Sequence, residues 1–144
     1  MAFVIEKVDE YKGYKYAVVF NATAGFRCGY VLLHGDEGIT ESERGKAHDI
    51  VCNGGITFVG SRENINLEAG TWVGFDCGHC FNGIDEVAWY EYMGRDYVEE
   101  RLDRYNVGCG MTGLPVLMIQ VEDDCKSIIS QLLGQGAVLE CPFE

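Results

Sequence analysis

Long apolar runs are missing from this chain of 144 residues. A membrane-spanning helix needs about 20 consecutive apolar residues, and no run in the sequence approaches that length. The segment over residues 1–12, MAFVIEKVDEYK, also lacks the basic stretch followed by a long apolar core that marks a secretory signal. These absences predict a cytoplasmic protein without a membrane partner, in which the 7 cysteines stay reduced.

Positive charge and proline are scarce as well. The sequence has 11 Lys and Arg against 23 Asp and Glu, a formal net charge of -12. Because phosphate backbones are bound through Lys and Arg that displace counterions, we expect no direct contact with nucleic acid. The acidic excess suits the basic surface of another protein, and an acidic surface that only keeps the protein soluble is the alternative. Only 2 prolines beside 19 glycines favour a sheet-rich fold with tight turns.

Alternating β-branched and aromatic residues predict a sheet in the first half of the chain. The length suits a single domain over residues 1–144, and no repeat or linker divides it. The first two strands resemble a hairpin, and the last two are expected to pair with the third in one antiparallel sheet. The expected strands cover residues 3–8, 14–20 and 26–33, a short strand within residues 50–60, and residues 71–77.

Two helices are predicted in the second half. Residues 121–136 combine an acidic first turn with an apolar face, and Gly134 can end the helix. A short charged helix is expected over residues 96–105, where Gly94 would stop a longer one, and residues 113–122 begin like a strand. The predicted fold class is therefore α+β, an antiparallel sheet with the C-terminal helix packed on one face and the short charged helix before it.

The stretch Cys77-Gly78-His79-Cys80 gathers reactive side chains directly after an apolar run. Its letters are identical to the active-site tetrapeptide of disulfide isomerases, in which a helix N-terminus stabilises the first thiolate. A thioredoxin-like fold needs a helix straight after the motif and a βαβ unit before it, whereas the letters FNG follow here and no such unit precedes. A thiol oxidoreductase is therefore an alternative rather than the leading hypothesis.

This stretch also contains only part of the residues that a zinc site or a Cys/His catalytic site would need. A Cys-x-x-Cys pair is half of a zinc site, and the chain has no second pair, so no metal and no other cofactor is predicted. On an extended strand Cys77 and His79 share one face and Asp76 points to the other, which permits a thiolate and imidazole pair without a group to orient it. A Cys/His hydrolase stays open beside the simpler interpretation of a packed thiol and a turn-capping imidazole.

Three separated segments carry a resemblance when they are taken together. They are CGYV (Cys28–Val31), NGGITF (Asn53–Phe58) and WVGFDCGH (Trp72–His79). They resemble a family of small uncharacterised proteins common in phages and prophages, with the pattern C-G-Y-V, then H-G-G-[IL]-T-[FY], then W-x-G-F-D-C-x-H-x-x-D. The helix at residues 121–132 is similar to the C-terminal helix of that family. Each segment combines glycine with aromatic residues in a pattern typical of a strand, and the three are expected to meet in a single sheet.

Two positions depart from that pattern. Asn53 stands where the family usually has His, and Asn82 stands where it usually has Asp. If the family carries out His/Asp chemistry or binds metal, this chain has lost part of the set, which favours binding over catalysis. The resemblance implies no established activity, only a phage or mobile-element context.

Charge, size and resemblance together predict a phage-encoded accessory protein that acts by binding in the host cytoplasm. The expected action is inhibition of a host defence system, as in an anti-CRISPR-like inhibitor whose carboxylates occupy the place of phosphates on a nuclease or other defence protein with a basic surface. The residues expected to bind lie in the motif segments, in the long polar loop and in the charged helix. They are Asn53, Gly54, Gly55, Trp72, Asp76, Cys77 and His79, then Asp36 and Glu37, then Glu99, Glu100 and Asp103.

A sponge for a nucleotide immune signal is the second binding hypothesis. Trp72 and aromatic residues near Trp89 could stack on a base, while the amides of the NGG turn and arginines such as Arg27 or Arg95 could hold phosphates. The alternative for the aromatic residues is a place in the core.

Overall fold

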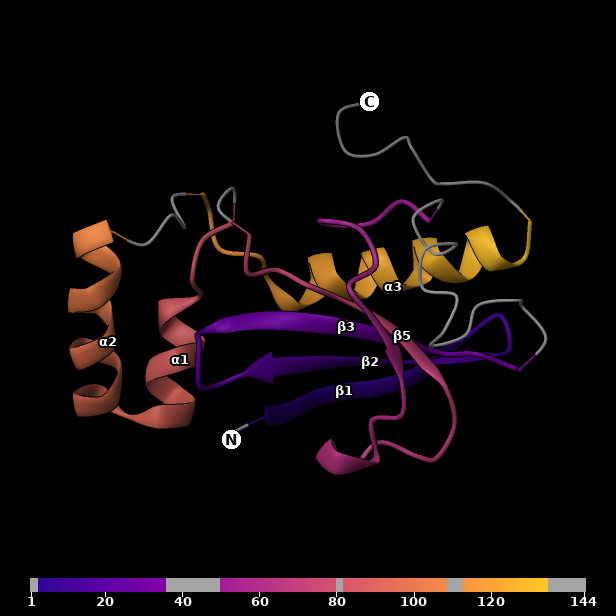
Figure 1. The fold of residues 1–144 in the computed structure, drawn as a ribbon, viewed down its shortest axis with the longest axis horizontal. Coiled ribbons are helices and arrows are strands. Elements are labelled where there is room, and N and C mark those ends of the chain that lie inside the picture. The colour runs from indigo at the N-terminus through magenta and orange to yellow at the C-terminus, as the bar shows by residue number, and fades with distance from the viewer. Residues whose placement is uncertain (1–2, 36–49, 80–81, 109–112, 135–144) are drawn as a thin grey trace.

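One antiparallel sheet organises the protein. The computed structural model describes residues 3–35, 50–79, 82–108 and 113–134. The sheet has the order β1-β2-β3-β5-β4 (Figure 1). Its strands are β1 (Phe3–Tyr11), β2 (Tyr14–Asn21), β3 (Phe26–Leu32), β4 (Phe58–Gly60) and β5 (Trp72–Asp76), and a short 3-10 turn, η2 (Glu63–Ile65), lies between β4 and β5. The predicted hairpin is confirmed as β1 and β2. One pairing differs from the prediction, because β4 pairs with β5 and lies beyond it, so only β5 reaches β3.

Three helices follow the sheet in the described part of the chain. They are α1 (Glu86–Met93), α2 (Arg95–Gly108) and α3 (Met118–Leu132). The α+β class is confirmed: α3 is the predicted C-terminal helix, and α2 is the predicted charged helix before it. Helices α1 and α2 stand at one end of the sheet (Figure 1). None of the described helices is long and apolar enough to cross a membrane.

Two helix starts were not predicted. Helix α1 begins after Asp85, whose side chain accepts a hydrogen bond of 3.2 Å from the N–H of Ala88, and Gly94 ends it before α2 begins. Helix α3 begins at Met118, within a segment expected to begin as a strand, because Gln120 Oε1 accepts the N–H of Leu117 at 2.7 Å. In both helices a local cap outweighs the strand preference of the nearby aromatic and branched residues.

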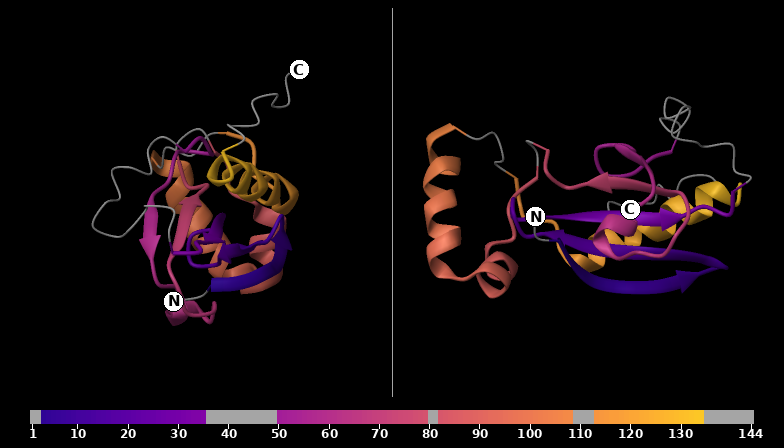
Figure 2. Two further views of the ribbon diagram at one scale, coloured as in Figure 1. Left: turned by 90° about the vertical axis from the view of Figure 1, so that its right-hand side faces the viewer. Right: turned by 60° about the horizontal axis from the view of Figure 1, so that its bottom comes forward.

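The two faces of the sheet are covered differently. Helix α3 packs on one face, and the segment that contains η2 covers the other (Figure 2). Beneath α3, Gly29 allows a close approach: a Cβ there would lie 2.5 Å from the Phe75 ring and 2.8 Å from Cys125 Sγ. On the opposite face, Arg62 lies over the rings of Tyr30 and Phe58, at 5.1 and 4.8 Å from their centroids. The sheet is thus enclosed on both sides.

A β-bulge in the edge strand β1 directs two consecutive charged side chains toward the α3 face. The register against β2 shifts between Ile5 and Lys7, which makes Glu6 the extra residue. Glu6 then meets Arg27 of β3, at 2.6 Å between Oε1 and Nε, and Lys7 Nζ lies 2.6 Å from a carboxylate oxygen of Glu122 in α3. Without the extra residue, alternation along β1 would place Glu6 and Lys7 on opposite faces.

Glu122 ties α3 to the sheet through two donors. Besides Lys7, the Tyr16 hydroxyl donates to its carboxylate. Hydrogen bonds from Lys7 and Tyr16 lower the pKa of Glu122, which outweighs the opposing effect of burial. The charged form of Glu122 is therefore the form that the fold favours.

Glu122→Gln is expected to destabilise the protein by about 2 kcal/mol at pH 7, the usual contribution of a hydrogen bond to a charged group. Because the pKa of Glu122 is lowered in the folded state, this stabilisation is complete above the ordinary glutamate pKa of about 4.3 and is lost as pH falls through the lower folded value. Urea unfolding of wild type and variant should show a gap at pH 7 that narrows on acidification. The exposed neighbour Asp123 provides the control Asp123→Asn, and a gap that is independent of pH, or equal in the control, would refute this account.

Candidate functional site

The three sequence segments singled out above lie on neighbouring strands. Cys28–Val31 belongs to β3, Trp72–Asp76 is β5, and the NGGITF segment leads into β4. Strand β5 lies between the other two, with Gly74 opposite Tyr30 on one side and Phe58 on the other. The prediction that these segments meet in a single sheet is confirmed. Polar residues therefore gather at the end of the sheet where β5 stops. We name this group the Asp76 site; it consists of Thr57, Asp76, His79, Asn82 and the turn over residues 53–55.

The carboxylate of Asp76 is the centre of this site. Its Oδ1 accepts the Gly78 N–H at 3.0 Å, and its Oδ2 accepts the Thr57 hydroxyl at 3.2 Å. His79 Nε2 lies 3.6 Å from Asp76 Oδ1, and both side chains are about one-third exposed, 27% for His79 and 34% for Asp76. The His79 N–H donates to Asn82 Oδ1 at 3.3 Å, which holds the turn after the strand. The arrangement places a partly exposed carboxylate beside a partly exposed imidazole whose Nε2 atom is buried.

The Asn53-Gly54-Gly55 turn closes the site from the other side. Gly54 and Gly55 have φ values of +73° and +80°, in the left-handed region that favours glycine. The His79 ring packs directly on Gly54, because a Cβ at Gly54 would lie 2.0 Å from His79 Nε2. The Asn53 N–H donates to Asp124 of α3 at 3.0 Å. The turn is thus held between α3 and the imidazole.

Two polar groups at this turn are in unfavourable surroundings: the side-chain oxygen of Asn53 and the carboxylate of Asp124 on α3. The side-chain Oδ1 of Asn53 is buried and accepts no hydrogen bond. Burial raises the pKa of Asp124, with a further contribution from Asp123, although the hydrogen bond from Asn53 opposes the shift. Unsatisfied and destabilised polar groups of this kind are characteristic of binding sites, where a ligand can supply the missing partner.

The thiols behind the site are buried, except that of Cys52, which is half-buried. Cys77 is fully buried, and burial raises its pKa well above the ordinary range. Burial also raises the pKa of Cys28 and of Cys52 to about 12, and that of Cys125 well above its usual value. These thiols are protonated at neutral pH, so they are poor nucleophiles. Cys80 lies outside the described residues.

The predicted sharing of a face by Cys77 and His79 does not occur. Cys77 belongs to the cluster beneath α3, opposite to Asp76, as alternation predicts. The strand ends at Asp76, however, so alternation stops there and the turn brings the His79 imidazole to the Asp76 carboxylate. Among the described residues no group of three or more His, Cys, Asp or Glu side chains is arranged to hold a metal ion.

The two tryptophans considered for base stacking lie in the core, whereas Tyr92, close to Trp89 in the sequence, is exposed and donates its hydroxyl to Glu6 at 2.6 Å. Trp72 is 1% exposed, and its indole N–H donates to the Glu68 carbonyl at 3.0 Å. Trp89 is fully buried, and its indole donates to the Ala22 carbonyl at 2.7 Å. Neither indole therefore has a ring face available for a nucleotide. Arg27, which was considered as a phosphate ligand, is also buried and is paired with the carboxylates of Glu6 and Asp85.

The expected acidic residues fall into two groups. Glu99 and Glu100 are exposed on α2, while for Asp103 only the backbone position in α2 is described. Asp36 and Glu37 lie outside the described residues. No sequence pattern pointed to Thr57 or Asp124, because their contacts join residues far apart in the chain, such as Asn53 and Asp124.

Gly54→Ala is expected to destabilise the protein more than Gly55→Ala. Both changes place a side chain at positive φ, which costs about 1–2 kcal/mol, but only the Cβ at Gly54 also meets His79, whereas Gly55 has open space. We expect a further loss of roughly 1–3 kcal/mol for Gly54→Ala, from the displaced ring. Urea unfolding measures both losses. Adding His79→Ala to Gly54→Ala should remove the extra loss, and equal losses for the two single variants would show that the ring contact is absent.

Comparisons with known proteins leave this geometry as the main evidence. The sequence matches no protein-family model, and neither curated proteins nor solved structures give a significant match.

Proposed function

We propose that this protein acts by binding the basic surface of another protein, as a phage-encoded inhibitor of a host defence nuclease, in the manner of an anti-CRISPR protein. The observation that carries the proposal is the display of exposed carboxylates on the two helices at one end of the sheet (Figure 1). These residues are Glu86 and Glu91 on α1, and Asp96, Glu99 and Glu100 on α2.

Helices α1 and α2 attach to the sheet through one apolar cluster, to which they also contribute the partly buried residues Ala88, Tyr90, Met93, Tyr97 and Leu102. Trp89 and Val98 are fully buried and pack with Phe20 in a separate small cluster. The remaining surface of α1 and α2 is free to carry charge. Residues one turn apart on a helix stand about 5–6 Å from each other, so carboxylates on this surface can face several Lys and Arg side chains that otherwise contact phosphates.

Positive charge on the same helices offsets only part of the acidic charge, because α1 has two Glu and no Lys or Arg, whereas α2 has three Arg beside four Asp and Glu. Arg95 Nε lies 3.1 Å from Glu99 Oε2, and the Arg101 guanidinium stacks on Tyr97 at 3.4 Å from the ring centroid. With a chain charge of -12, the long-range field at this end stays negative and favours encounter with a basic partner. The phage origin and the place of action in the host cytoplasm are supported by the resemblance of the three motif segments.

The two alternative functions have less support. A nucleotide sponge needs accessible rings and arginines, whereas Trp72 and Trp89 are buried and Arg27 is held by carboxylates. A Cys/His enzyme or thiol oxidoreductase centred on Cys77 needs a reactive thiolate, whereas burial keeps that thiol protonated. Binding through the acidic end relies on carboxylates of α1 and α2 that are exposed.

Reversing charge on α1 is expected to weaken inhibition. The probe is a guide-loaded Cas9-type nuclease, whose binding to labelled target DNA is followed by fluorescence anisotropy with and without this protein. Glu86→Lys/Glu91→Lys should weaken competition at least about tenfold, because opposite-charge contacts become repulsive. Competition by the wild type should also decline as salt is raised, since exposed charges are screened.

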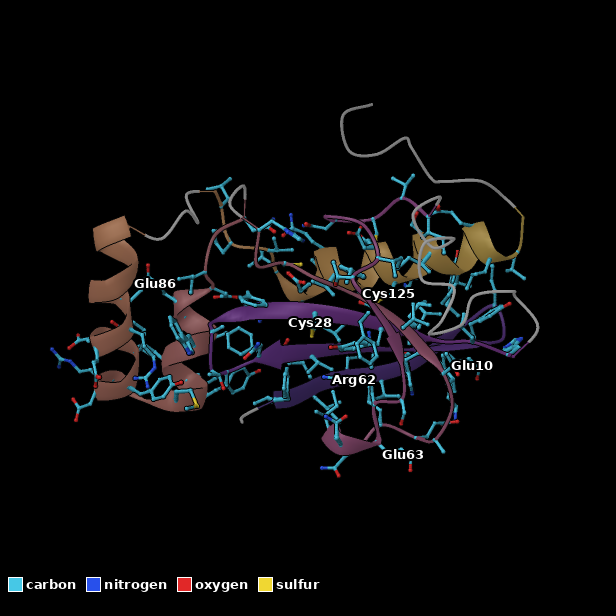
Figure 3. All side chains as sticks on the ribbon, viewed as in Figure 1. Glu10, Cys28, Arg62, Glu63, Glu86 and Cys125 are labelled. Carbon is cyan, nitrogen blue, oxygen red and sulfur yellow. The ribbon has the colours of Figure 1, made fainter. Side chains whose placement is uncertain are left out.

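The matched control reverses two exposed carboxylates elsewhere. Glu10 and Glu63 lie far from Glu86, at the hairpin end and at η2 (Figure 3), so Glu10→Lys/Glu63→Lys changes the net charge equally without touching the helices. Unfolding midpoints of all variants establish that each is folded. Equal weakening by both pairs, or competition that is insensitive to salt, would contradict binding through α1 and α2.

A further inference from the structure

The segment that leads into α3 exposes an unusual amount of apolar surface. Leu114 is 85% exposed, Leu117 48%, Met118 36% and Ile119 62%. Single exposed apolar residues are common on proteins, but four within six positions of one segment are unusual, and concentrated apolar surface of this kind marks interaction sites. We name residues 114–119 the apolar segment.

Folding alone does not account for these side chains. Leu117 occupies the N-cap of α3, and Met118 and Ile119 follow in its first turn, where Ser, Thr, Asp and Glu are the stabilising residues. The helix start is instead supported by the Gln120 side chain, which accepts the Leu117 N–H. Leu117 and Ile119 are largely exposed, and the Leu117 side chain forms no capping hydrogen bond. Neither side chain therefore contributes much to folding, and both can contact a partner.

The apolar segment is held in place by backbone contacts. Leu114 O accepts the Gly83 N–H at 2.8 Å, and the Gly113 N–H donates to the Asn82 carbonyl at 3.1 Å. A Cβ at Gly83 would lie only 2.2 Å from Gly113 O, so the two backbone segments are in direct contact at Gly83. The buried Arg27 also donates to Val116 O at 3.1 Å. A surface held in this way loses little conformational entropy on binding.

Exposed charge close to this segment along the chain is acidic, and Arg27, which contacts it from inside the protein, is buried and paired with Glu6 and Asp85. The two stretches that meet at the bridge between Gly83 and Pro115 contain no Lys or Arg over residues 63–94 and 105–125. Glu86 follows the bridge on α1, and Asp123 follows Ile119 by one turn of α3, both exposed. A second copy of this chain would bring the same acidic rim and be repelled. A partner with positive charge around an apolar centre is complementary.

We propose that the apolar segment is the anchor with which this protein docks on a partner protein whose surface has an apolar pocket bordered by Lys and Arg. The inference deepens the proposed function, since the partner is taken to be the same basic protein that meets the carboxylates of α1. Leu114 and Ile119 fill the pocket as central contacts, and Glu86 and Asp123 pair with its basic rim. This is the usual division of an interface into an apolar centre and a polar periphery.

A photoreactive phenylalanine analogue at position 119 of the full chain tests the docking surface in cells that carry the gene. The control places the analogue at position 51, since Val51 is similarly exposed, 54% against 62% for Ile119. We expect an adduct with another protein at position 119 only, and mass spectrometry should place the crosslinked peptide in an apolar surface pocket flanked by Lys or Arg.

Leu114→Asp in the same chain should lower this adduct at least about tenfold, the effect expected of a central interface residue. Val8, 52% exposed on β1, provides the control Val8→Asp, which should leave the adduct unchanged. The unfolding midpoints should stay near that of the wild type, since both side chains are exposed. The proposal is overturned by no adduct at position 119, by an adduct with a second copy, by an acidic crosslinked region, or by equal adduct with Leu114→Asp.

The Cas9-type competition assay separates failure of this inference from failure of the proposed function. Wild-type competition that Leu114→Asp leaves intact removes the anchor while the function stands. No competition by the wild type, together with a Leu114-dependent adduct on a partner of the expected chemistry, removes the nuclease function while the anchor stands.

Discussion

The buried ion cluster around Arg27 is the interaction on which the rest of the structure depends. Its guanidinium is 6% exposed and meets Glu6 from the bulge of β1 and Asp85 at the start of α1, each at 2.6 Å. Burying a guanidinium is costly unless its donors are satisfied, and removal of one partner of such a cluster is strongly destabilising, by about 3–5 kcal/mol. Here two carboxylates and the Val116 carbonyl satisfy it. One side chain thereby joins β1, β3, α1 and the segment before α3.

That cluster determines the chemistry of the nearby surface. The positive charge of Arg27 is buried and paired with Glu6 and Asp85, so it does not offset the exposed carboxylates of α1 and α2. Asp85 both accepts from Arg27 and caps α1, which fixes where the acidic helix begins. The contact with Val116 positions the apolar segment beside that helix start. An acidic rim and an apolar centre are therefore adjacent because a single buried cation organises both.

Local patterns predicted the parts of the fold whose causes are local. Period-two alternation located the strands, and the glycine and aromatic signatures correctly grouped β3, β4 and β5 in one sheet. Helix α1 was not predicted, because its formation depends on the Asp85 cap and on burial of Trp89 against residues distant in the sequence, such as Phe20. The polar end was predicted only in part: the Asp76 and His79 pair depends on where β5 ends, and the contact of Asn53 with Asp124 joins residues 71 positions apart. No period in the sequence encodes such a contact.

Two carboxylates on α3 show how structural and candidate functional groups can be told apart. Glu122 is buried with Lys7 and Tyr16 as donors, and its pKa is lowered, so its charge contributes to stability. Asp124, two residues later, accepts a backbone N–H from Asn53, and its pKa is raised because burial dominates. A charge that the fold stabilises is explained by the fold, whereas a charge that the fold disfavours is retained at a cost. Together with the unsatisfied oxygen of Asn53, this cost distinguishes the Asp76 site from the ion cluster around Glu122, whose charge the fold itself stabilises.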